Sequence, residues 1–336
     1  MRRDRRQLLY MIIIAAVLIG AAAFARFSGG VRTGKGYPIS GDAYLLDTFC
    51  SITLYEGGGE EALQAALGAL REYDALFDDK QEGSDLHRIN DRGEETEVSI
   101  RPETVRMLQL GRDICAFSGG ALEPAIRPVT LLWDFKNGTE PPEKEALQEA
   151  LKKVGSLRYR LEGERFIAED PHVQIDAGAF AKGFIADRLG EVLREKGCSS
   201  AIINLGGNVL CVGGKPDGSE FAVGIRDPKG SGSASLRTLK IRDGSVVTAG
   251  AYERCFLFEG KRYHHILDPA TGYPAETGLE SVTVTGPESA VCDALSTALF
   301  VKGADEGEAL LNAYNAQVRS GYRAYFLFED GRMREV

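Results

Sequence analysis

The sequence lacks the short motifs of several common catalytic and metal-binding classes. Its six cysteines form no C-x-x-C pair, which argues against a structural zinc site. No G-x-G-x-x-G fingerprint is present, which argues against a Rossmann dinucleotide site. Neither a serine-centred elbow nor an H-E-x-x-H motif occurs, so the hydrolase chemistries built on those motifs have no support.

The chain also lacks an excess of positive charge. Its formal net charge is −9, and the four arginines and one aspartate of residues 1–25 contribute +3 of that, which leaves −12 for the remainder. An acidic body of this kind argues against nucleic acid as a partner and against adhesion to anionic lipid. Most cysteines lie in apolar runs and are typical of small buried side chains, and the sequence leaves open whether any form disulfides.

Only the N-terminus carries a long apolar run. Arginines within residues 2–6 precede an uncharged stretch from Leu8 to Phe24, which suits a membrane anchor or the core of a cleaved secretory signal. No cysteine follows this run before Cys50, so no lipid-attachment cysteine stands at its end. Because arginines stay on the cytoplasmic side, we expect an extracytoplasmic body. The sequence predicts an anchor or signal at 1–26, a flexible stem at 27–41 and a catalytic domain at 42–336.

The rest of the chain predicts a single large α+β body rather than a regular βαβ alternation. Apolar residues at helical spacing predict a helix that ends near Phe77. Pro102 opens a second helix, which the glycines after Ser118 end. Further helices are predicted near 179–196 and 289–302, a strand at 51–55, and hairpins around the Glu-Gly or Asp-Gly pairs at 162–163, 259–260 and 330–331.

Four segments carry residues suited to phosphate and metal chemistry. Asp293 and Thr297 lie four apart on a predicted helix, so they share one side and can offer two oxygens to a hard cation such as Mg²⁺. Residues 175–183 lead into a helix whose N-terminus and Lys182 suit a phosphate. A buried strand at 201–205 ends in a glycine pair. His264 and His265 are neighbours on a strand and therefore face opposite sides. Taken singly, each segment is at least as often structural: a solvated helix face, an ordinary turn or a structural histidine.

Taken in order, these segments resemble the ApbE family of FAD:protein FMN transferases over roughly residues 44–312. The resemblance depends on six motifs. They are Leu46-Asp47-Thr48, the run from Ser84 to Asn90, Gly120 to Pro124 with Leu132 to Phe135, Asp176 to Gly183 with Asp187, His265 to Pro269, and Asp293 to Thr297.

The resemblance implies a mixed α+β fold with FAD in a cleft, and roles for individual residues. It implies that Mg²⁺ is held by Asp293, Thr297 and a main-chain oxygen of Ala179, and that His265 is the catalytic base. The residues that correspond to flavin-binding positions of the family are Leu46, Ala121, Leu122, Glu123, Asp176, Lys182 and Ile266. Four positions depart from the family pattern, because Leu46 replaces a methionine, Glu123 an aspartate, Asp78 a serine and Lys80 an aromatic residue.

The implied reaction is Mg²⁺-dependent transfer of FMN from FAD to a threonine or serine hydroxyl of an extracytoplasmic redox protein, with release of AMP. Two alternatives remain open from the sequence: an FAD pyrophosphatase that uses water as acceptor, and a non-enzymatic flavin- or metal-binding surface protein. If His265 accepts the proton of the hydroxyl, its neutral form is required, and a free imidazole titrates near ~6.5. The sequence therefore predicts that transfer falls as the pH drops through about that value.

Overall fold

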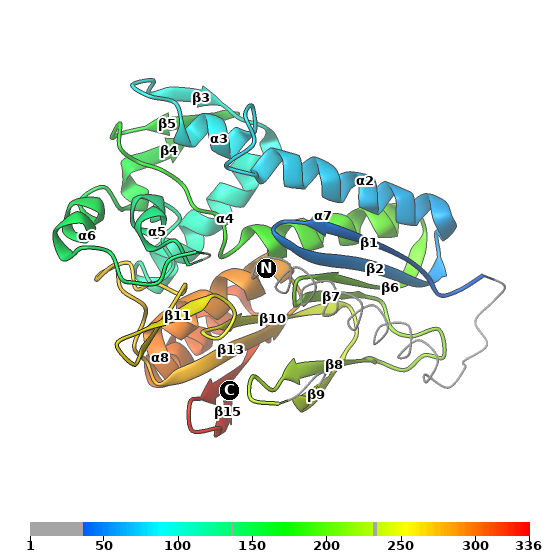
Figure 1. The fold of residues 1–336 in the computed structure, drawn as a ribbon. Helices are drawn as coiled ribbons and strands as arrows, with labels where there is room; N and C mark the ends of the chain where they lie inside the picture. Colours follow the sequence, from blue (N-terminus) through cyan, green and yellow to red (C-terminus); the bar gives the residue numbers. More distant parts are fainter. Residues whose placement is uncertain (1–35, 136, 231–233) are drawn as a thin grey trace, which may run out of the picture. The chain divides into compact units, whose positions relative to one another are not determined.

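The central feature of the fold is an antiparallel sheet, seen in a computed structural model that describes residues 36–135, 137–230 and 234–336 (Figure 1). Within these ranges the sheet has eight strands in the order β1-β2-β6-β7-β10-β13-β14-β15. The strands are β1 Ile39–Leu45, β2 Thr48–Gly57, β6 Cys198–Leu205, β7 Asn208–Val212, β10 Gly244–Gly250, β13 Leu279–Gly286, β14 Arg323–Phe328 and β15 Met333–Glu335.

Helices cover one face of this sheet, and smaller sheets surround it (Figure 1). The helices are α2 Gly59–Phe77, α3 Asp85–Asn90, α4 Pro102–Ser118, α5 Arg127–Trp133, α6 Lys144–Leu151, the 3₁₀ turn η1 Ser156–Arg158, α7 Ala181–Glu195 and α8 Ser289–Val318. One smaller sheet has three strands in the order β3 Glu97–Ser99, β5 Arg165–Ala168 and β4 Tyr159–Leu161. Two others are hairpins, formed by β8 Phe221–Arg226 with β9 Ser235–Ile241 and by β11 Cys255–Phe258 with β12 Lys261–His264.

Side-chain alternation along the strands creates two cores. Cys50, Ile52 and Leu54 of β2 point to the helical face, where they join the main core with α2, α7 and α8. The β8–β9 hairpin covers part of the opposite face, because every second residue of β8, such as Phe221 and Val223, is buried in a smaller core. The predicted α+β body is therefore confirmed.

A third cluster surrounds Trp133 at the end of α5. Its indole N–H donates to the carbonyl of Gly272 at 2.8 Å, and the ring is only 1% exposed. The rings of Phe135, Phe256 and Tyr263 lie 5.4–6.4 Å from it, centroid to centroid. Because β11 and β12 supply two of these rings, aromatic packing attaches the β11–β12 hairpin to the body.

Local signals fixed several elements as predicted. Pro102 occupies the first turn of α4, and Gly119 ends the helix in the left-handed region at φ 63°. The three hairpins predicted at Glu-Gly and Asp-Gly pairs are present as β4–β5, β11–β12 and β14–β15. The helix predicted near 289–302 is longer than expected. Gly303 adopts φ 73°, ψ 175° and kinks the chain there, but α8 continues beyond it to Val318.

The predicted stem boundary at residue 41 is wrong by several residues. β1 begins at Ile39 and pairs along its whole length with β2, and the compact body begins at Tyr37. The Tyr37 hydroxyl donates to the carbonyl of Gly57 and accepts the N–H of Gly59, both at 2.9 Å. Polar and small residues such as Gly41 concealed this edge strand from the sequence pattern. The predicted anchor at 1–26 lies outside the described residues.

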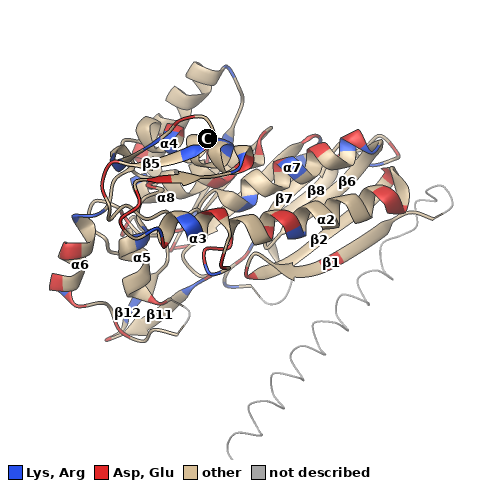
Figure 2. Cartoon of the chain, turned by 90° about the horizontal axis from the view of Figure 1, so that it is seen from above, with Lys and Arg blue, Asp and Glu red and all other residues tan. Residues whose placement is uncertain are grey.

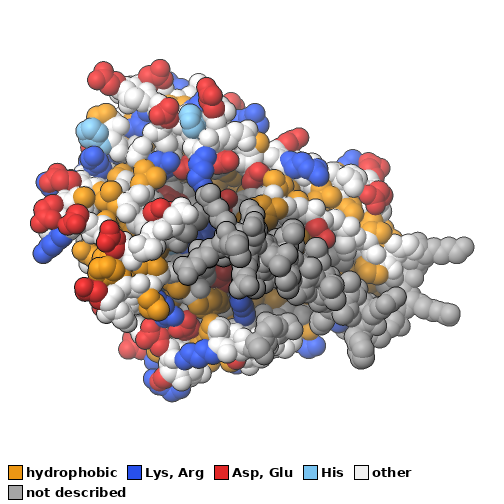
Figure 3. Space-filling model, in the orientation of Figure 1, with side chains coloured by type: hydrophobic (Ala, Val, Ile, Leu, Met, Phe, Trp, Pro, Cys, Tyr) orange, Lys and Arg blue, Asp and Glu red, His pale blue; other side chains and the backbone are white. Residues whose placement is uncertain are grey.

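Charged side chains of both signs share the surface. On α2 and α7 acidic and basic residues are interspersed (Figure 2), and charges of both signs also occur on the visible part of the face in Figure 3. Among the partly buried pairs, Arg262 of β12 donates to both carboxylate oxygens of Glu280 at 2.8 and 3.0 Å. No helix in the three described ranges combines the length and the apolarity needed to cross a bilayer.

Candidate functional site

Asp293 is the centre of the candidate site. It lies in the second turn of α8, is 5% exposed, and its Oδ2 accepts the backbone N–H of Gly183 at 2.9 Å. A Cβ atom on Gly183 would stand 2.7 Å from Cβ of Asp293 and closer still to the carbonyl oxygen of Ser289. Only glycine therefore lets the first turn of α7 touch α8 at this point. This close contact places the N-terminus of α7, which suits a phosphate, next to the carboxylate of Asp293.

The charge of Asp293 is only partly compensated. Burial raises the pKa of its carboxyl, whereas the ammonium of Lys182, the N–H of Gly183 and the side chain of Asn208 lower it. Asn208 is 3% exposed, and its amide nitrogen forms no hydrogen bond. A buried carboxylate with one hydrogen-bond donor is stabilised by a cation placed beside it.

The two other predicted metal ligands come from the same two segments. Thr297 lies one turn beyond Asp293 on α8 and is partly exposed, and Ala179 is partly buried in the loop before α7. That loop folds back on itself, because the N–H groups of Phe180 and Ala181 both donate to the carbonyl of Ala177 at 3.1 and 2.9 Å. Across the described chain no three histidine, cysteine, aspartate or glutamate side chains cluster to hold a metal. A cation here would thus have Asp293 as its charged ligand and neutral oxygens otherwise, a donor set that suits Mg²⁺.

Lys182 connects Asp293 to the other predicted residues. Its Nζ donates to the carbonyl of Gly178 at 3.3 Å. Burial dominates the pKa shifts of the Asp293 carboxyl, the His265 imidazole and the Cys50 thiol, and the positive charge of Lys182 adds a smaller lowering to each. Three segments distant in sequence therefore lie within electrostatic reach of one ammonium group.

Asp176 lies at the start of the loop before α7, and one of its carboxylate oxygens forms a hydrogen bond within that loop. Its Oδ1 accepts the N–H of Gly178 at 2.9 Å, and its Oδ2 accepts the hydroxyl of Thr130 at 2.8 Å. The first bond is an Asx-type turn that shapes the approach to α7. The second ties the loop to α5, so Asp176 fixes the position of the backbone that leads to Ala179 and Lys182.

His264 and His265 face different surroundings, but the two do not share a strand as predicted, because β12 ends at His264 and His265 lies in the bend that follows. His264 ends β12, is 7% exposed and meets the ring of Phe300 edge-on at 5.5 Å between centroids. His265 is partly exposed, and its Nδ1 lies 3.3 Å from the carbonyl oxygen of Arg254. Protein surrounds most of the His265 ring, and this burial lowers its pKa to about 4, aided by the charge of Arg254.

Leu46 occupies the tight turn between β1 and β2. Both Leu46 and Asp47 have positive φ, at 56° and 55°. The N–H of Leu46 donates to Oδ1 of Asp74 on α2 at 2.7 Å, which fixes this strained turn. Burial is the main cause that raises the pKa of the Cys50 thiol on β2, and the charge of Asp74 adds to this rise.

Ala121, Leu122 and Ile266 are core residues, and Glu123 is partly buried. Ala121, Leu122 and Ile266 are 6%, 2% and 4% exposed. The carboxylate of Glu123 accepts the N–H groups of Ala125 and Ser156 at 2.8 and 2.9 Å, and the hydroxyl of Ser156. Its side chain therefore joins the segment after α4 to η1.

The motif from Ser84 to Asn90 positions other parts of the site. Asp85 is 2% exposed and accepts the N–H of Arg101 at 2.7 Å and the hydroxyl of Thr104 at 2.5 Å, so it caps α4. The side chain of Asn90 clamps the backbone of Ile175 through both its amide groups, at 2.9 and 2.7 Å. The motif thus holds the residue immediately before Asp176.

Asp187 fixes the start of α8. Its two carboxylate oxygens accept the N–H groups of Ser289 and Ala290, each at 2.8 Å. Burial raises its pKa to about 6, and these two donors oppose the shift. Sequence reasoning assigned no role to Asp74 or Asn208; the signal available for Asn208 was a polar residue directly after a glycine pair.

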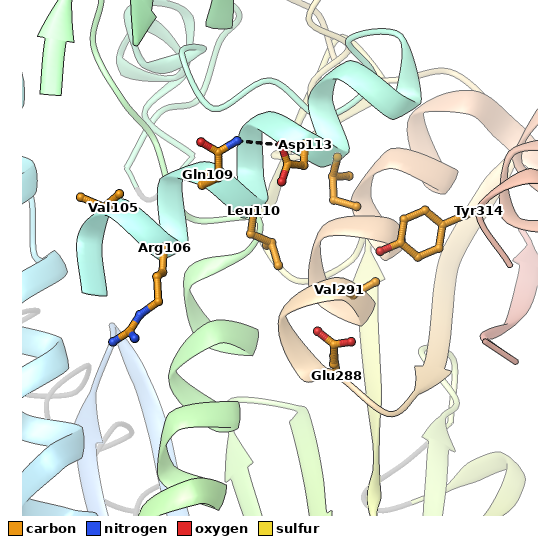
Figure 4. A pocket seen from close by; sticks show the side chains of 9 residues that line it. Val105, Arg106, Gln109, Leu110, Asp113, Glu288, Val291 and Tyr314 are labelled. Carbon is orange, nitrogen blue, oxygen red and sulfur yellow. Dashed lines mark hydrogen bonds between the residues drawn. The ribbon is translucent and has the colours of Figure 1, made fainter. Parts of the chain in front are cut away.

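A groove of about 410 Å³ lies elsewhere, between α4 and the start of α8 (Figure 4). Its floor is mixed, with Leu110 and Val291 beside the charged Arg106 and Glu288, and Gln109 donates to Asp113 at 2.7 Å. None of the predicted site residues lines it. The groove is therefore distinct from the region around Asp293 and Lys182.

Comparison with known proteins decides the family. Residues 46–320 match the ApbE family. The chain belongs to the ApbE family. An ApbE relative from Treponema pallidum, named FAD:protein FMN transferase, is 33% identical over 311 residues, 86% of this chain and 84% of that protein. One from Klebsiella pneumoniae with the same name is 33% identical over 273 residues, 80% of this chain and 84% of that protein.

Solved ApbE structures share the fold. The ApbE protein of Thermotoga maritima superimposes with a TM-score of 0.80 at 28% identity and covers 88% of this chain and 96% of its own. The flavin transferase ApbE of Vibrio cholerae gives 0.77 at 22% identity, with 89% and 96% covered. The resemblance predicted from six motifs is confirmed, and with it the prediction that the chain is an enzyme of this family.

Proposed function

We propose that this ApbE-family chain transfers FMN from FAD to a threonine or serine hydroxyl of a partner protein and releases AMP. One observation carries the proposal: the N–H of Gly183 binds the buried carboxylate of Asp293 at 2.9 Å beside Lys182, whose charge also reaches His265. This arrangement joins a helix start, a cation-seeking carboxylate, an ammonium group and a base. Those are the groups that cleavage of a pyrophosphate requires.

We propose that Mg²⁺ is the resident metal, held by Asp293, Thr297 and the main-chain oxygen of Ala179. The buried, incompletely compensated carboxylate of Asp293 supports this assignment, and so do the neutral oxygens next to it. When bound, the ion would neutralise charge on the phosphate oxygens of FAD. The departures from the family pattern at Leu46, Asp78, Lys80 and Glu123 concern the flavin side and leave this donor set intact.

The side chains of the chain supply orientation and proton transfer. The N-terminus of α7 and Lys182 would bind the pyrophosphate, while the clamped backbone around Asp176, Ala121 and Ile266 would border the flavin nucleotide. The acceptor oxygen attacks the phosphorus of the FMN half, and the bond from that phosphorus to the bridging oxygen breaks. AMP leaves with the bridging oxygen, and the hydroxyl proton passes to His265.

The surroundings of His265 set the state in which it works. With its pKa lowered to about 4, the imidazole is neutral at ordinary pH and ready to accept a proton. The negative pyrophosphate beside it would raise that pKa and strengthen the base when substrate is bound. We therefore expect the substrate-free enzyme to lose its base at a lower pH than the ~6.5 of a free imidazole.

We also propose that the body works outside the cytoplasm, attached through residues 1–26, and that its partner is a redox protein there. The arginines before the apolar run from Leu8 to Phe24 support this orientation. Protease treatment of intact spheroplasts tests it, because an extracytoplasmic body is digested whereas a cytoplasmic one is protected.

The proposed reaction is tested by mixing the body with FAD, Mg²⁺ and a candidate acceptor domain and weighing the acceptor by mass spectrometry. A gain equal to one FMN moiety with matching AMP release supports transfer. AMP release at the same rate without an acceptor, and with no gain in its mass, would assign the site to hydrolysis by water instead. FAD binding with no AMP release would leave only a binding protein.

A further inference from the structure

Asn208 is a polar residue in an otherwise apolar row. It begins β7 after the turn formed by Gly206 and Gly207, and it shares the helical face of the sheet with Leu210 and Val212, both in the main core. The alternate residues Val209 and Cys211 pack in the smaller core on the opposite face. The side chain of Asn208 therefore points toward the layer that holds α7 and α8.

The turn before Asn208 is fixed on both sides. Gly206 and Gly207 have φ of 61° and 100°, values that glycine accommodates without strain. Gly206 donates its N–H to the carbonyl of Phe49 at 3.1 Å, and Gly207 donates to Oδ1 of Asn204 at 2.9 Å. The backbone thus presents Asn208 in one position rather than leaving it on a loose loop.

The amide nitrogen of Asn208 has no hydrogen-bond partner although the residue is 3% exposed. A buried donor without an acceptor is costly, so such a group in a folded protein calls for a partner nearby. β7 packs against both α7 and α8, and the carboxylate of Asp293 on α8 lies within hydrogen-bonding reach of the Asn208 side chain. Asp293 in turn has a single backbone donor, the N–H of Gly183.

We propose that Asn208 is a positioning residue of the cation site, whose amide N–H donates to the carboxylate of Asp293 and fixes the oxygen that faces the metal. This inference depends on the proposed metal site. A ligating carboxylate with one donor can rotate about its remaining torsion, whereas a second donor holds both oxygens in place. Outer-shell partners of this kind typically change metal affinity by 10- to 100-fold.

The test compares three variants with the unaltered protein. Asn208→Leu keeps the approximate shape and removes the donor, and Asp293→Asn removes the charged ligand. Ser200→Ala is the matched control, because Ser200 is 1% exposed, its hydroxyl also lacks a partner, and it lies on β6 several residues before the turn. The probe is Mn²⁺, whose free concentration is read by electron paramagnetic resonance, with Mg²⁺ added as competitor.

We expect Asn208→Leu to weaken Mn²⁺ binding by about 10- to 100-fold. The Mg²⁺ concentration for half-maximal transfer should rise by a similar factor while kcat at saturating Mg²⁺ changes little. Ser200→Ala should leave both quantities within a factor of about two of the unaltered protein, although each variant changes one buried polar group. Circular dichroism checks that the variants are folded. If Asn208→Leu does not fold, Asn208→Ala replaces it and is expected to show the same loss of Mn²⁺ affinity.

Three outcomes would overturn different statements. If Asn208→Leu binds Mn²⁺ as the unaltered protein does while Asp293→Asn does not bind it, Asn208 has no positioning role and the metal site stands. Should Asp293→Asn bind Mn²⁺ undiminished, the metal site itself is wrong and the role of Asn208 fails with it. An equal loss of affinity in Ser200→Ala would assign the effect to general destabilisation.

Discussion

The two adjacent histidines show how neighbouring residues acquire different roles. His264 is enclosed beside Phe300, whereas His265 lies beyond the end of β12 and within reach of the charge of Lys182. The pKa of each ring is about 4, mainly through burial, so their protonation states do not distinguish them. Position alone therefore supports the proposal that His265, and not His264, is the base.

We predict that His265→Ala lowers the transfer rate by about 10²–10⁴-fold while FAD still binds, because that is the usual contribution of a positioned base. His264→Ala should keep most of the rate and lose stability instead, since it removes packing against Phe300. Transfer rate and FAD affinity are measured for both. A dead His264→Ala beside a healthy His265→Ala would reverse the assignment.

At FAD concentrations far below saturation, where the rate reports the substrate-free enzyme, transfer should stay nearly constant as the pH falls from 7 to about 5 and decline only near the His265 pKa of about 4. The sign follows from the base role, because protonation removes the lone pair that accepts the proton. Both histidines also bind protons more readily when unfolded, so stability should fall between about pH 6.5 and 4. Circular dichroism along the series separates loss of catalysis from unfolding. A midpoint near 6.5 in folded protein would contradict the low pKa.

Asp293→Ala should abolish Mg²⁺-dependent transfer and leave a folded protein, since it deletes the only charged ligand of the proposed site. Thr297→Val should be milder, because it removes a neutral oxygen and preserves the shape of the side chain. The rates are compared across a Mg²⁺ titration. Full activity in both variants would show that the cation binds elsewhere.

At the scale of elements, the junction of α7 and α8 decides whether the site exists. Gly183 and Asp293 are 110 residues apart in the sequence and touch through one hydrogen bond. Asp187 of α7 caps α8 a few residues before Asp293. The two helices are thus joined twice near the site, once through a side chain and once through the backbone of a glycine.

We predict that Gly183→Ala destabilises the protein by about 1–3 kcal/mol and lowers transfer sharply, because the added methyl group forces the two helices apart. Gly68→Ala on α2 is the control, since its methyl group meets nothing within 4 Å. That change should stabilise the helix by about 0.5–1 kcal/mol and leave activity unaltered. Thermal unfolding and transfer rate are measured for each. A Gly183→Ala protein with normal activity would show that the close contact is not required.

Local chemistry explains what the sequence could predict among these elements. Pro102 and Gly119 act within their own helix, and an Asp-Gly or Glu-Gly pair sets its own hairpin, so short patterns suffice. β1 was missed because Gly41 and Asp42 are poor strand formers, and pairing with β2 overrides that preference. The extension of α8 was missed because Gly303 resembles a helix end.

The features of the candidate site also fall into those that local sequence patterns predict and those that depend on tertiary packing. Asp293 and Thr297 share one turn of a helix, and a spacing of four reveals that relation directly. The contact of Gly183 with Asp293, the approach of Lys182 to His265 and the burial of Asn208 depend on tertiary packing. No local pattern contains that information. These residues could be assigned to one site only through the order of the six motifs along the chain, which resembles that of the ApbE family.

At the scale of the whole molecule, the folded body begins at Tyr37 and every predicted site residue lies within it. We predict that a chain starting at Ser28 is soluble and as active as the full-length protein in detergent, because it retains the whole body. Gel filtration and the transfer assay check this. Aggregation, or loss of FAD binding, would show that residues 1–27 belong to the fold.

The single tryptophan of the chain gives this molecule an optical reporter of its own. Trp133 is buried among aromatic rings, and one of them belongs to Tyr263, two residues before His265. Indole emission depends on ring packing and on the bond to Gly272, so movement of the β11–β12 hairpin should change its wavelength and lifetime. Flavins absorb where indoles emit, and bound FAD should therefore quench Trp133 by energy transfer. Substrate entry can be followed in real time without any label.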